Sequence, residues 1–426
     1  MNNEFKRVDW ATATNIYEVN LRQYTYEGNF KSFQKELPRL KDMGVETLWF
    51  MPITPIGIAN RKGTLGSYYS VRDYVNTNEE FGSVDDFKVL VQTAHSLGQK
   101  VIIDWVANHT AWDHRWTQTN PDFYSRNHDG TFRPPFPEWE DVIHLNYDNE
   151  ALWDAMIEAM AFWVKECNID GFRCDMAHLV RLSFWHEARK RLDKLKPLFW
   201  LAECEEVDFH QVFDATYTWK WMHASQEYCH HRISLHELFG TLREYDLDYP
   251  KEAIRTYFTS NHDENSWNGS EYEKYGEAAK VLAVFSCTWN GVPMLYSGQE
   301  LPNTKRLMFF DKDPIEWNGN FALHDFYKAL LNLHLTNPAC RGGDIKVATI
   351  KLHTTHPDKV LAYLRRRNEH EVLVILNLSG EPVDDLMIHE AIIEGEFRNI
   401  FSNEKSKLDE HAVYKLDQWG WLVYEK

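Results

Sequence analysis

Four short segments of the chain end in clusters of charged and polar side chains that could do acid–base chemistry. They are DWVANH at 104–109, GFRCD at 171–175, LAEC at 201–204 and SNHDE at 260–264. Each follows or contains a brief apolar run, and buried strands of parallel sheets have this continuous pattern rather than a polar–apolar alternation. Carboxylates, an arginine and imidazoles at the ends of successive strands would meet at the mouth of a catalytic barrel. The sequence therefore predicts an enzyme.

Two of these carboxylates have surroundings that suit different tasks. Arg173 and Asp175 point to the same side of their strand because side chains alternate along a strand. We therefore expect the guanidinium to lower the pKa of Asp175 and keep it ionised. Glu203 ends the apolar run FWLAE, where burial would raise its pKa, as a general acid requires. A charged carboxylate roughly 5–5.5 Å from a protonated one is the arrangement that cleaves glycosidic bonds with retention.

The elements that must position these residues alternate between strand and helix patterns. Strands are expected at 15–21, 46–52, 100–106, 169–175, 198–204, 212–218, 255–261 and 293–297. Helix patterns separate them, for example from the N-cap Ser83 to Gly98. Eight strands alternating with helices predict an α/β protein built on a (β/α)8 TIM barrel.

Two segments depart from this alternation. Residues 107–148 are rich in Pro, Trp, Asp and Asn, and helix patterning resumes only at Glu150, so we expect a short inserted domain at the barrel mouth. From residue 342 the strand-like runs KVLAYLRRR, EVLVILNLS, EFRNIFS and WGWLVYEK follow without helices. They predict a C-terminal antiparallel β-sandwich domain over 342–426. The barrel then comprises residues 1–106 and 149–341.

The composition narrows the class of partner. A formal charge of −18 disfavours nucleic acids and anionic membranes as partners. The aromatic fraction of 14% suits a carbohydrate ligand, although a Trp-rich core would give the same value. The six cysteines are scattered without paired spacing, and the N-terminus has no apolar signal segment. We expect a cytoplasmic protein, and a secreted protein without its signal would look the same.

The chain resembles the α-amylase family, the retaining glycosidases and transglycosidases that act on α-glucosidic bonds. The four segments match the four signature regions of that family in order, and the resemblance extends over the barrel, the insertion and the C-terminal domain. It implies that Asp175 is the nucleophile and that Glu203 is the general acid and then the base. It also implies that Asp263 stabilises the transition state.

The same resemblance implies a set of residues that bind the sugar undergoing cleavage. Arg173 would orient Asp175, Asp104 would have a partly structural role, and Tyr69, in SYYSVRDY, would stack on the sugar ring. His109 and His262 would form hydrogen bonds with it. Each residue also has a structural reading: a strand-end Glu can be a surface charge, Asn-His-Asp can cap a helix, and Tyr68 could take the place of Tyr69.

The chain departs from the family pattern at two positions. Many members have a Lys-His pair where His178-Leu179 stand here, so His178 would contact the leaving-group side or serve as a core or cap histidine. His144 stands where many members have an Asp that binds calcium. Two expected ligand positions are thus missing from a site that needs six to eight oxygens. Asn108 and Asp141 could still contribute, but we expect no metal and no cofactor.

These observations favour a retaining hydrolase of α-1,4-glucosidic bonds in maltodextrins or in starch and glycogen fragments. An α-glucosidase or a transglycosylase on the same scaffold is an alternative that the sequence leaves open, as it does endo or exo action and oligomeric state. A non-catalytic module is a third possibility, because some members are accessory subunits of transporters that lost their carboxylates. This chain retains all three carboxylates.

Overall fold

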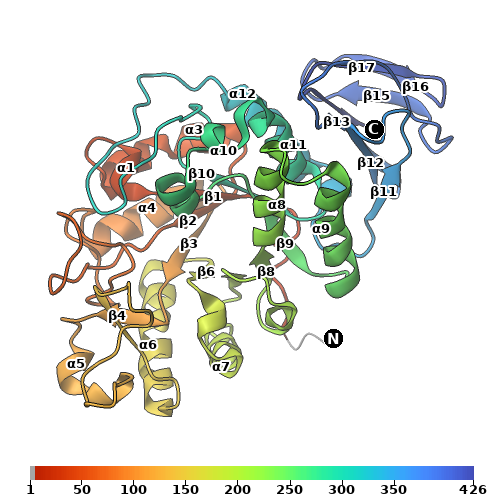
Figure 1. Cartoon of the computed structure of the whole chain (residues 1–426). Helices are drawn as coiled ribbons and strands as arrows, with labels where there is room; N and C mark the ends of the chain where they lie inside the picture. The colour runs from red at the N-terminus through yellow and green to blue at the C-terminus, as the bar shows by residue number, and fades with distance from the viewer. Residues whose placement is uncertain (1–4) are drawn as a thin grey trace.

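The computed structural model describes residues 5–426 and has a closed barrel of parallel strands at its centre (Figure 1). The strands are β1 (Ile16–Val19), β2 (Thr47–Phe50), β3 (Lys100–Trp105), β6 (Gly171–Cys174), β7 (Phe199–Ala202), β8 (Ala215–Tyr217), β9 (Ile254–Tyr257) and β10 (Val292–Tyr296). Around the ring they follow the order β1-β10-β9-β8-β7-β6-β3-β2. The predicted (β/α)8 barrel is therefore confirmed, and each of the eight predicted runs contains or overlaps one of these strands.

Helices surround the barrel. The longer ones are α3 (Leu37–Met43), α4 (Val84–Ser96), α6 (Glu150–Cys167), α7 (Leu182–Leu192), α8 (Trp219–Cys229), α9 (Leu235–Asp248), α11 (Ala279–Thr288) and α12 (His324–Thr336). Short helical turns are α1 (Leu21–Tyr24), α2 (Phe30–Phe33), α5 (Trp116–Thr119) and α10 (Glu271–Tyr275). Helix α4 begins at Ser83, whose side chain accepts a hydrogen bond from Asp86 N–H in a capping box. Gly98 follows its end with a φ of 78°, as the sequence indicates.

The interior of the barrel changes from apolar to polar along its axis. Ile16, Ile102 and Phe199 belong to one buried apolar cluster inside the barrel. Two residues further along the same strands, side chains of the same face include Glu18 and Asp104. Apolar side chains thus fill the barrel toward the amino ends of its strands. Charged side chains gather at the carboxyl ends, where active sites of such barrels lie.

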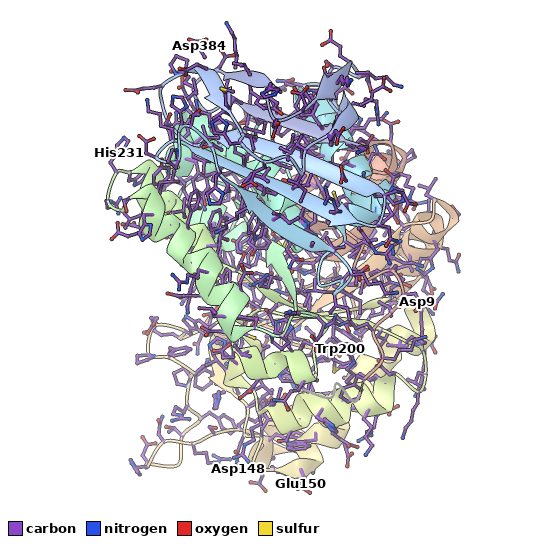
Figure 2. All side chains as sticks on the ribbon, turned by 90° about the vertical axis from the view of Figure 1, so that its right-hand side faces the viewer. Asp9, Asp148, Glu150, Trp200, His231 and Asp384 are labelled. Carbon is purple, nitrogen blue, oxygen red and sulfur yellow. The ribbon has the colours of Figure 1, made fainter. Side chains whose placement is uncertain are left out.

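The insertion and the C-terminal domain lie on opposite sides of the barrel (Figure 1). The insertion pairs β4 (His109–Ala111) with β5 (Val142–His144) in antiparallel fashion. In Figure 2, Asp148 and Glu150 lie at one end of the molecule and Asp384 of the C-terminal domain at the other. The domain boundaries at 107, 149 and 342 stay predictions.

The C-terminal strands form two antiparallel sheets that share one core. They are β11 (Ala348–Leu352), β12 (Val360–Arg367), β13 (His370–Asn377), β14 (Val383–Met387), β15 (Gly395–Asn399), β16 (Lys405–Leu408), β17 (Val413–Leu416) and β18 (Trp421–Glu425). Six of them form a sheet in the order β11-β12-β13-β18-β15-β16, and β14 pairs with β17. Leu386 and Leu416 of the smaller sheet pack with Leu373 of the larger one. In residues 5–426, no helix is both long and apolar enough to cross a membrane.

Candidate active site

The guanidinium of Arg173 lies at the centre of the polar end of the barrel. Its Nη1 donates to both oxygens of Asp104, at 2.9 and 3.1 Å, and to Asp175 Oδ1 at 3.1 Å. Its Nη2 lies 2.9 Å from Glu203 Oε2, and its Nε donates to the hydroxyl of Tyr217 at 3.2 Å. The side chain of Arg173 is fully buried. One cation therefore serves three carboxylates, and it fixes their positions relative to one another.

The carboxylate of Glu203 is held by the backbone of Met176 as well as by Arg173. The N–H of Met176 donates to Glu203 Oε2 at 2.8 Å. Met176 has a φ of 40° and a ψ of 47°, in the left-handed region that residues other than glycine rarely adopt. This conformation directs the N–H of Met176 at the carboxylate. Oε2 is thus occupied, and Oε1 is the oxygen that can carry and transfer a proton.

The pKa of Asp175 differs in direction from the expectation. Burial, followed by the charge of Glu203, raises the pKa of Asp175 well above its ordinary value, although Arg173 opposes the shift. Burial likewise raises the pKa of Asp104 to about 6 against the effect of Arg173. Arg173 donates hydrogen bonds to Asp104 and Asp175 and forms an ion pair with Glu203, so its charge is divided among three carboxylates and does not outweigh the burial of Asp175. Before substrate binds, burial and the neighbouring charge of Glu203 therefore favour the protonated form of Asp175.

A second charged cluster surrounds His262. Its Nδ1 lies 2.5 Å from Glu18 Oε1, and its Nε2 lies 2.8 Å from the hydroxyl of Tyr69 and 3.2 Å from Asp263 Oδ2. Burial opposes protonation of the ring, but Asp263 and Glu18 raise the pKa of His262 well above its ordinary value. The imidazolium overcomes the desolvation of Asp263 and lowers the pKa of that carboxyl. His262 is thus a cation at neutral pH, and Asp263 is an anion.

Glu18 was not predicted from the sequence, although it is part of this cluster. Glu18 lies in β1, is fully buried, and its Oε2 is buried without a hydrogen-bond partner in the structure. An isolated glutamate inside the apolar run IYEVN was the signal that could have identified it, because buried carboxylates need a partner.

The two clusters form the floor of a cavity of about 530 Å³. Five of the predicted residues line it: Tyr69, His109, Asp175, Glu203 and Asp263. Lys62, Trp139, Trp267, Phe309 and Phe310 also line it, and the sequence analysis assigned no sugar contact to them. Arg173, Asp104 and His262 lie behind this lining and hold it through the contacts above. A cavity of this size with aromatic walls and a few convergent polar groups suits a small polar ligand with apolar faces.

Tyr69 and His109 supply further contacts at the floor. The hydroxyl of Tyr69 donates to Asp104 Oδ2 at 3.0 Å, and its ring stacks on His262 with 5.3 Å between centroids. Burial lowers the pKa of His109 to about 3, so its imidazole is neutral. Tyr68, the alternative to Tyr69, instead donates to Asn20 Oδ1 and does not line the cavity.

His178 is the one predicted site residue that the structure places apart from the others. It is exposed, in the turn Ala177–Leu179 that follows β6, and it does not line the cavity. The turn that begins at Met176 directs its side chain to the surface. A sugar contact for His178 stays a prediction, and it would require a substrate that extends beyond the cavity.

The residues at the family's calcium position do not fit calcium. His144 supplies nitrogen where a carboxylate is expected, and its Nδ1 lies 2.8 Å from the hydroxyl of Ser125. Asp141 Oδ1 is 3.3 Å from the ammonium of Lys62. Asn108 Oδ1 is buried without a hydrogen-bond partner, but one amide oxygen is far from the six to eight oxygens that calcium needs. Within the described chain, no group of three or more His, Cys, Asp or Glu residues could hold a metal ion.

Comparison with known proteins places the chain in a family. The family model described as "Alpha amylase, catalytic domain" matches residues 3–135 and 136–313. The chain therefore belongs to the alpha-amylase family, and the predicted family is confirmed.

Solved structures and curated sequences agree with this assignment. The chain is similar to a noncanonic maltogenic alpha-amylase, AmyB from Thermotoga neapolitana, with a TM-score of 0.89 and 31% identity over 97% of this chain and 98% of the other. An alpha-amylase from Lactobacillus plantarum gives a TM-score of 0.87 and 27% identity, covering 98% of this chain and 99% of the other.

Two curated relatives are longer than this chain. Alpha-amylase MalA of Haloarcula japonica is 26% identical over 398 residues, which cover 88% of this chain and 56% of MalA. The alpha-1,4-glucan:maltose-1-phosphate maltosyltransferase of Picrophilus torridus is 26% identical over 432 residues, 92% of this chain and 65% of the relative. The chain thus spans less than two thirds of the length of these two proteins.

Proposed function

We propose that this protein hydrolyses α-1,4-glucosidic bonds in maltodextrins or in starch and glycogen fragments, with retention of configuration. The observation that carries the proposal is the placement of Asp175 and Glu203. They follow the adjacent strands β6 and β7, contact the same guanidinium and line one cavity. Adjacent strands lie about 4.8 Å apart, which is compatible with the roughly 5–5.5 Å separation of a retaining pair.

In the first step, Asp175 attacks the anomeric carbon while Glu203 protonates the departing oxygen. Oδ1 of Asp175 accepts from Arg173, so Oδ2 is the attacking atom. Glu203 Oε2 accepts from Met176, so Oε1 delivers the proton. The bond between the anomeric carbon and the leaving oxygen breaks as the bond to Asp175 forms. Asp175 reacts as the anion, with Arg173 donating to its Oδ1, and the proton given to the leaving oxygen comes from Glu203.

In the second step, Glu203 removes a proton from water, and the water oxygen attacks the anomeric carbon of the glycosyl-enzyme. Asp175 is released as a carboxylate, and Arg173 Nη1 again donates to it. Two inversions at the same carbon give net retention. The pair then returns to its starting protonation state, because Glu203 has regained the proton that it gave up in the first step.

Three other residues act on the same sugar ring. Tyr69 presents its ring to the apolar face of the sugar, and His109, as a neutral imidazole, forms hydrogen bonds with its hydroxyls. Asp263 is ionised and accepts hydrogen bonds from hydroxyls of the ring as it flattens. The anion of Asp263 also offsets positive charge that develops at the anomeric carbon, which lowers the barrier by electrostatic stabilisation.

A transferase is the second candidate, supported by relatives named as maltosyltransferases, such as that of Picrophilus torridus. Transfer differs from hydrolysis only in the second step, where a sugar hydroxyl or inorganic phosphate replaces water. Asp175 and Glu203 would keep the same roles in both reactions.

We also propose that the protein needs no cofactor, has no nucleic-acid or membrane partner and works in the cytoplasm. The formal charge of −18 supports the absence of polyanionic partners. All six cysteines are free, which suits a reducing compartment. Fractionation of the source cells followed by activity measurement would test the location.

The decisive experiment incubates the protein with maltoheptaose and follows the products by chromatography, with Asp175→Asn as the blank. Shorter maltodextrins whose newly formed ends are initially α-anomers by NMR would support a retaining hydrolase. Products longer than the substrate, or a sugar phosphate formed when phosphate is added, would favour transfer. An initial β-anomer, or equal turnover by the blank, would refute the mechanism.

A further inference from the structure

Three segments that are distant in sequence are joined along one side of the cavity. They are the loop after β2 (51–83), the insertion and the loop after β10 (297–323). The ammonium of Lys62 donates to Glu138 O at 2.7 Å and lies 3.3 Å from Asp141 Oδ1, so it links the first loop to the insertion. We call this set of joined segments the rim wall.

The same loop is also joined to the segment after β10. Leu65 N–H donates to Phe310 O at 3.0 Å, and Thr64 N–H donates to Asp311 Oδ1 at 2.8 Å. The backbones approach so closely that a Cβ added to Gly63 would lie 2.4 Å from Phe310 Cβ. From below, the fully buried Arg22 donates to Gly66 O at 3.0 Å and to Phe309 O at 3.4 Å. The rim wall is therefore a packed structure with a buried support.

The order of strands shows on which side of the substrate this wall stands. In the closed ring β1 lies opposite β7, with β2 and β10 on either side of β1. Glu203 follows β7 and protonates the leaving group, so the leaving part of the chain departs over the β7 side. The part retained on Asp175 must extend the other way, over β1. That is where the loops after β2 and β10 are joined.

The wall also has the surface to contact a sugar. Phe309 is nearly parallel to Tyr69, with 6.4 Å between ring centroids and 15° between planes, and Trp267 lies 5.3 Å from Phe309. Lys62 and Phe310 complete this side of the cavity. A sugar that stacks on Tyr69 can therefore have a neighbour against Phe309, and a longer chain would have to pass the joined loops.

We propose that the rim wall closes the cleft on the glycone side, so that the enzyme binds the non-reducing end of an α-glucan and releases glucose or maltose. This inference rests on the proposed hydrolysis of α-glucosidic bonds and adds which bonds are accessible. A substrate whose non-reducing end is enlarged cannot seat its terminal sugar, whereas the reducing end extends freely over β7.

The test compares two maltoheptaoses labelled with a fluorophore at the reducing end, one free at the non-reducing end and one blocked there by an ethylidene group. We expect wild-type protein to shorten the free substrate stepwise, with glucose or maltose as the unlabelled product. The blocked substrate should react at least 100-fold more slowly.

Two variants open the wall, and a third serves as the matched control. Asp311→Ala removes the acceptor of Thr64 N–H, and Lys62→Met removes the link to the insertion that borders the cavity. In either variant we expect the blocked substrate to be cleaved at least 10-fold faster relative to the free one. Asn76→Ala removes the donor to Asp73 Oδ2, an exposed bond of 3.0 Å within the loop 51–83 and outside the cavity, and should leave this ratio unchanged.

The outcomes separate the two proposals. Equal cleavage of both substrates by wild-type protein, with labelled products of many lengths from the start, would overturn the closed cleft and leave the hydrolase standing. No cleavage of the free substrate would overturn the proposed function itself. If one opening variant fails to fold, the other variant and the wild-type comparison still decide the question.

Discussion

The floor of the cavity is carried by strand ends, whereas its rim is carried by loops. On the floor, Arg173, Asp175 and Glu203 come from neighbouring strands, and Arg173 joins them through a hydrogen bond to Asp175 and an ion pair with Glu203. On the rim, Thr64 and Asp311 come from loops separated by 247 positions in the sequence. The floor therefore determines the reaction, and the rim determines which part of a substrate reaches it. The two regions should respond differently to mutation.

The largest effect should come from Asp175→Asn on the floor. Without a nucleophile, kcat should fall on the order of 10⁴- to 10⁶-fold. The free energy of unfolding should stay equal or rise, because the variant removes a buried carboxyl whose pKa is raised by burial and by Glu203. Steady-state kinetics and urea unfolding measure the two quantities. A variant that unfolds in the absence of denaturant would show that Asp175 is needed for the fold.

Arg173→Met, a second change on the floor, should lower the stability of the folded protein. It leaves Asp104 and Asp175 buried without their cation, so the free energy of unfolding should fall by about 3–5 kcal/mol. On the rim, Asp113→Ala alters an exposed contact and should change it by roughly 0.5 kcal/mol or less. Urea denaturation of both variants makes the comparison. Equal losses would mean that the floor is no more dependent on its contacts than the rim.

Glu18→Gln should change the pH dependence while keeping the shape of the floor. Glu18 raises the pKa of His262, so its neutralisation lowers that pKa, and the imidazolium is lost at lower pH. The alkaline limb of the kcat/KM profile should therefore move to lower pH by about one unit. NMR of labelled histidine gives an independent reading. A kcat/KM that falls equally at every pH, with no movement of the alkaline limb, would indicate that Glu18 acts by packing.

Removal of metal should have the smallest effect. At the positions where the family resemblance implies calcium ligands, this chain has His144 beside Ser125, and Asp141 beside Lys62. We expect EDTA to change Tm by less than about 1 °C, because no ligand that stabilises the folded state would be removed. Differential scanning calorimetry with EDTA and with added calcium measures it. A calcium-dependent rise of several degrees would show that the rim has a metal site after all.

The sequence allowed prediction of most of the floor. Carboxylates, Arg173 and His262 stand at the ends of apolar runs, and the period of a strand places them on one side, so their meeting followed from local pattern. The pKa of Asp175 could not be predicted in the same way. It depends first on burial and then on the charge of Glu203, which together outweigh the effect of Arg173, and only the three-dimensional arrangement shows that balance. Glu18 was missed because a single residue carried its signal.

The rim could not be predicted for a physical reason. Its contacts are single hydrogen bonds between loops, such as Leu65 to Phe310, and loops have no hydrophobic period that would indicate a partner. The C-terminal domain shows a related limit. Its short strands β14 and β16 are largely exposed and charged, so only the apolar runs of their neighbours were read as strands.

The left-handed backbone at Met176 affects thermal stability and catalytic rate in opposite directions. For a residue that has a Cβ atom, this backbone conformation costs about 1–2 kcal/mol. Met176→Gly would therefore be an obvious choice for an engineer who seeks a more thermostable enzyme. Yet the same backbone geometry aims the N–H of Met176 at Glu203 Oε2, and a glycine would be free to turn it away. A screen that selects for survival at high temperature should therefore find substitutions here that yield a more durable and slower catalyst.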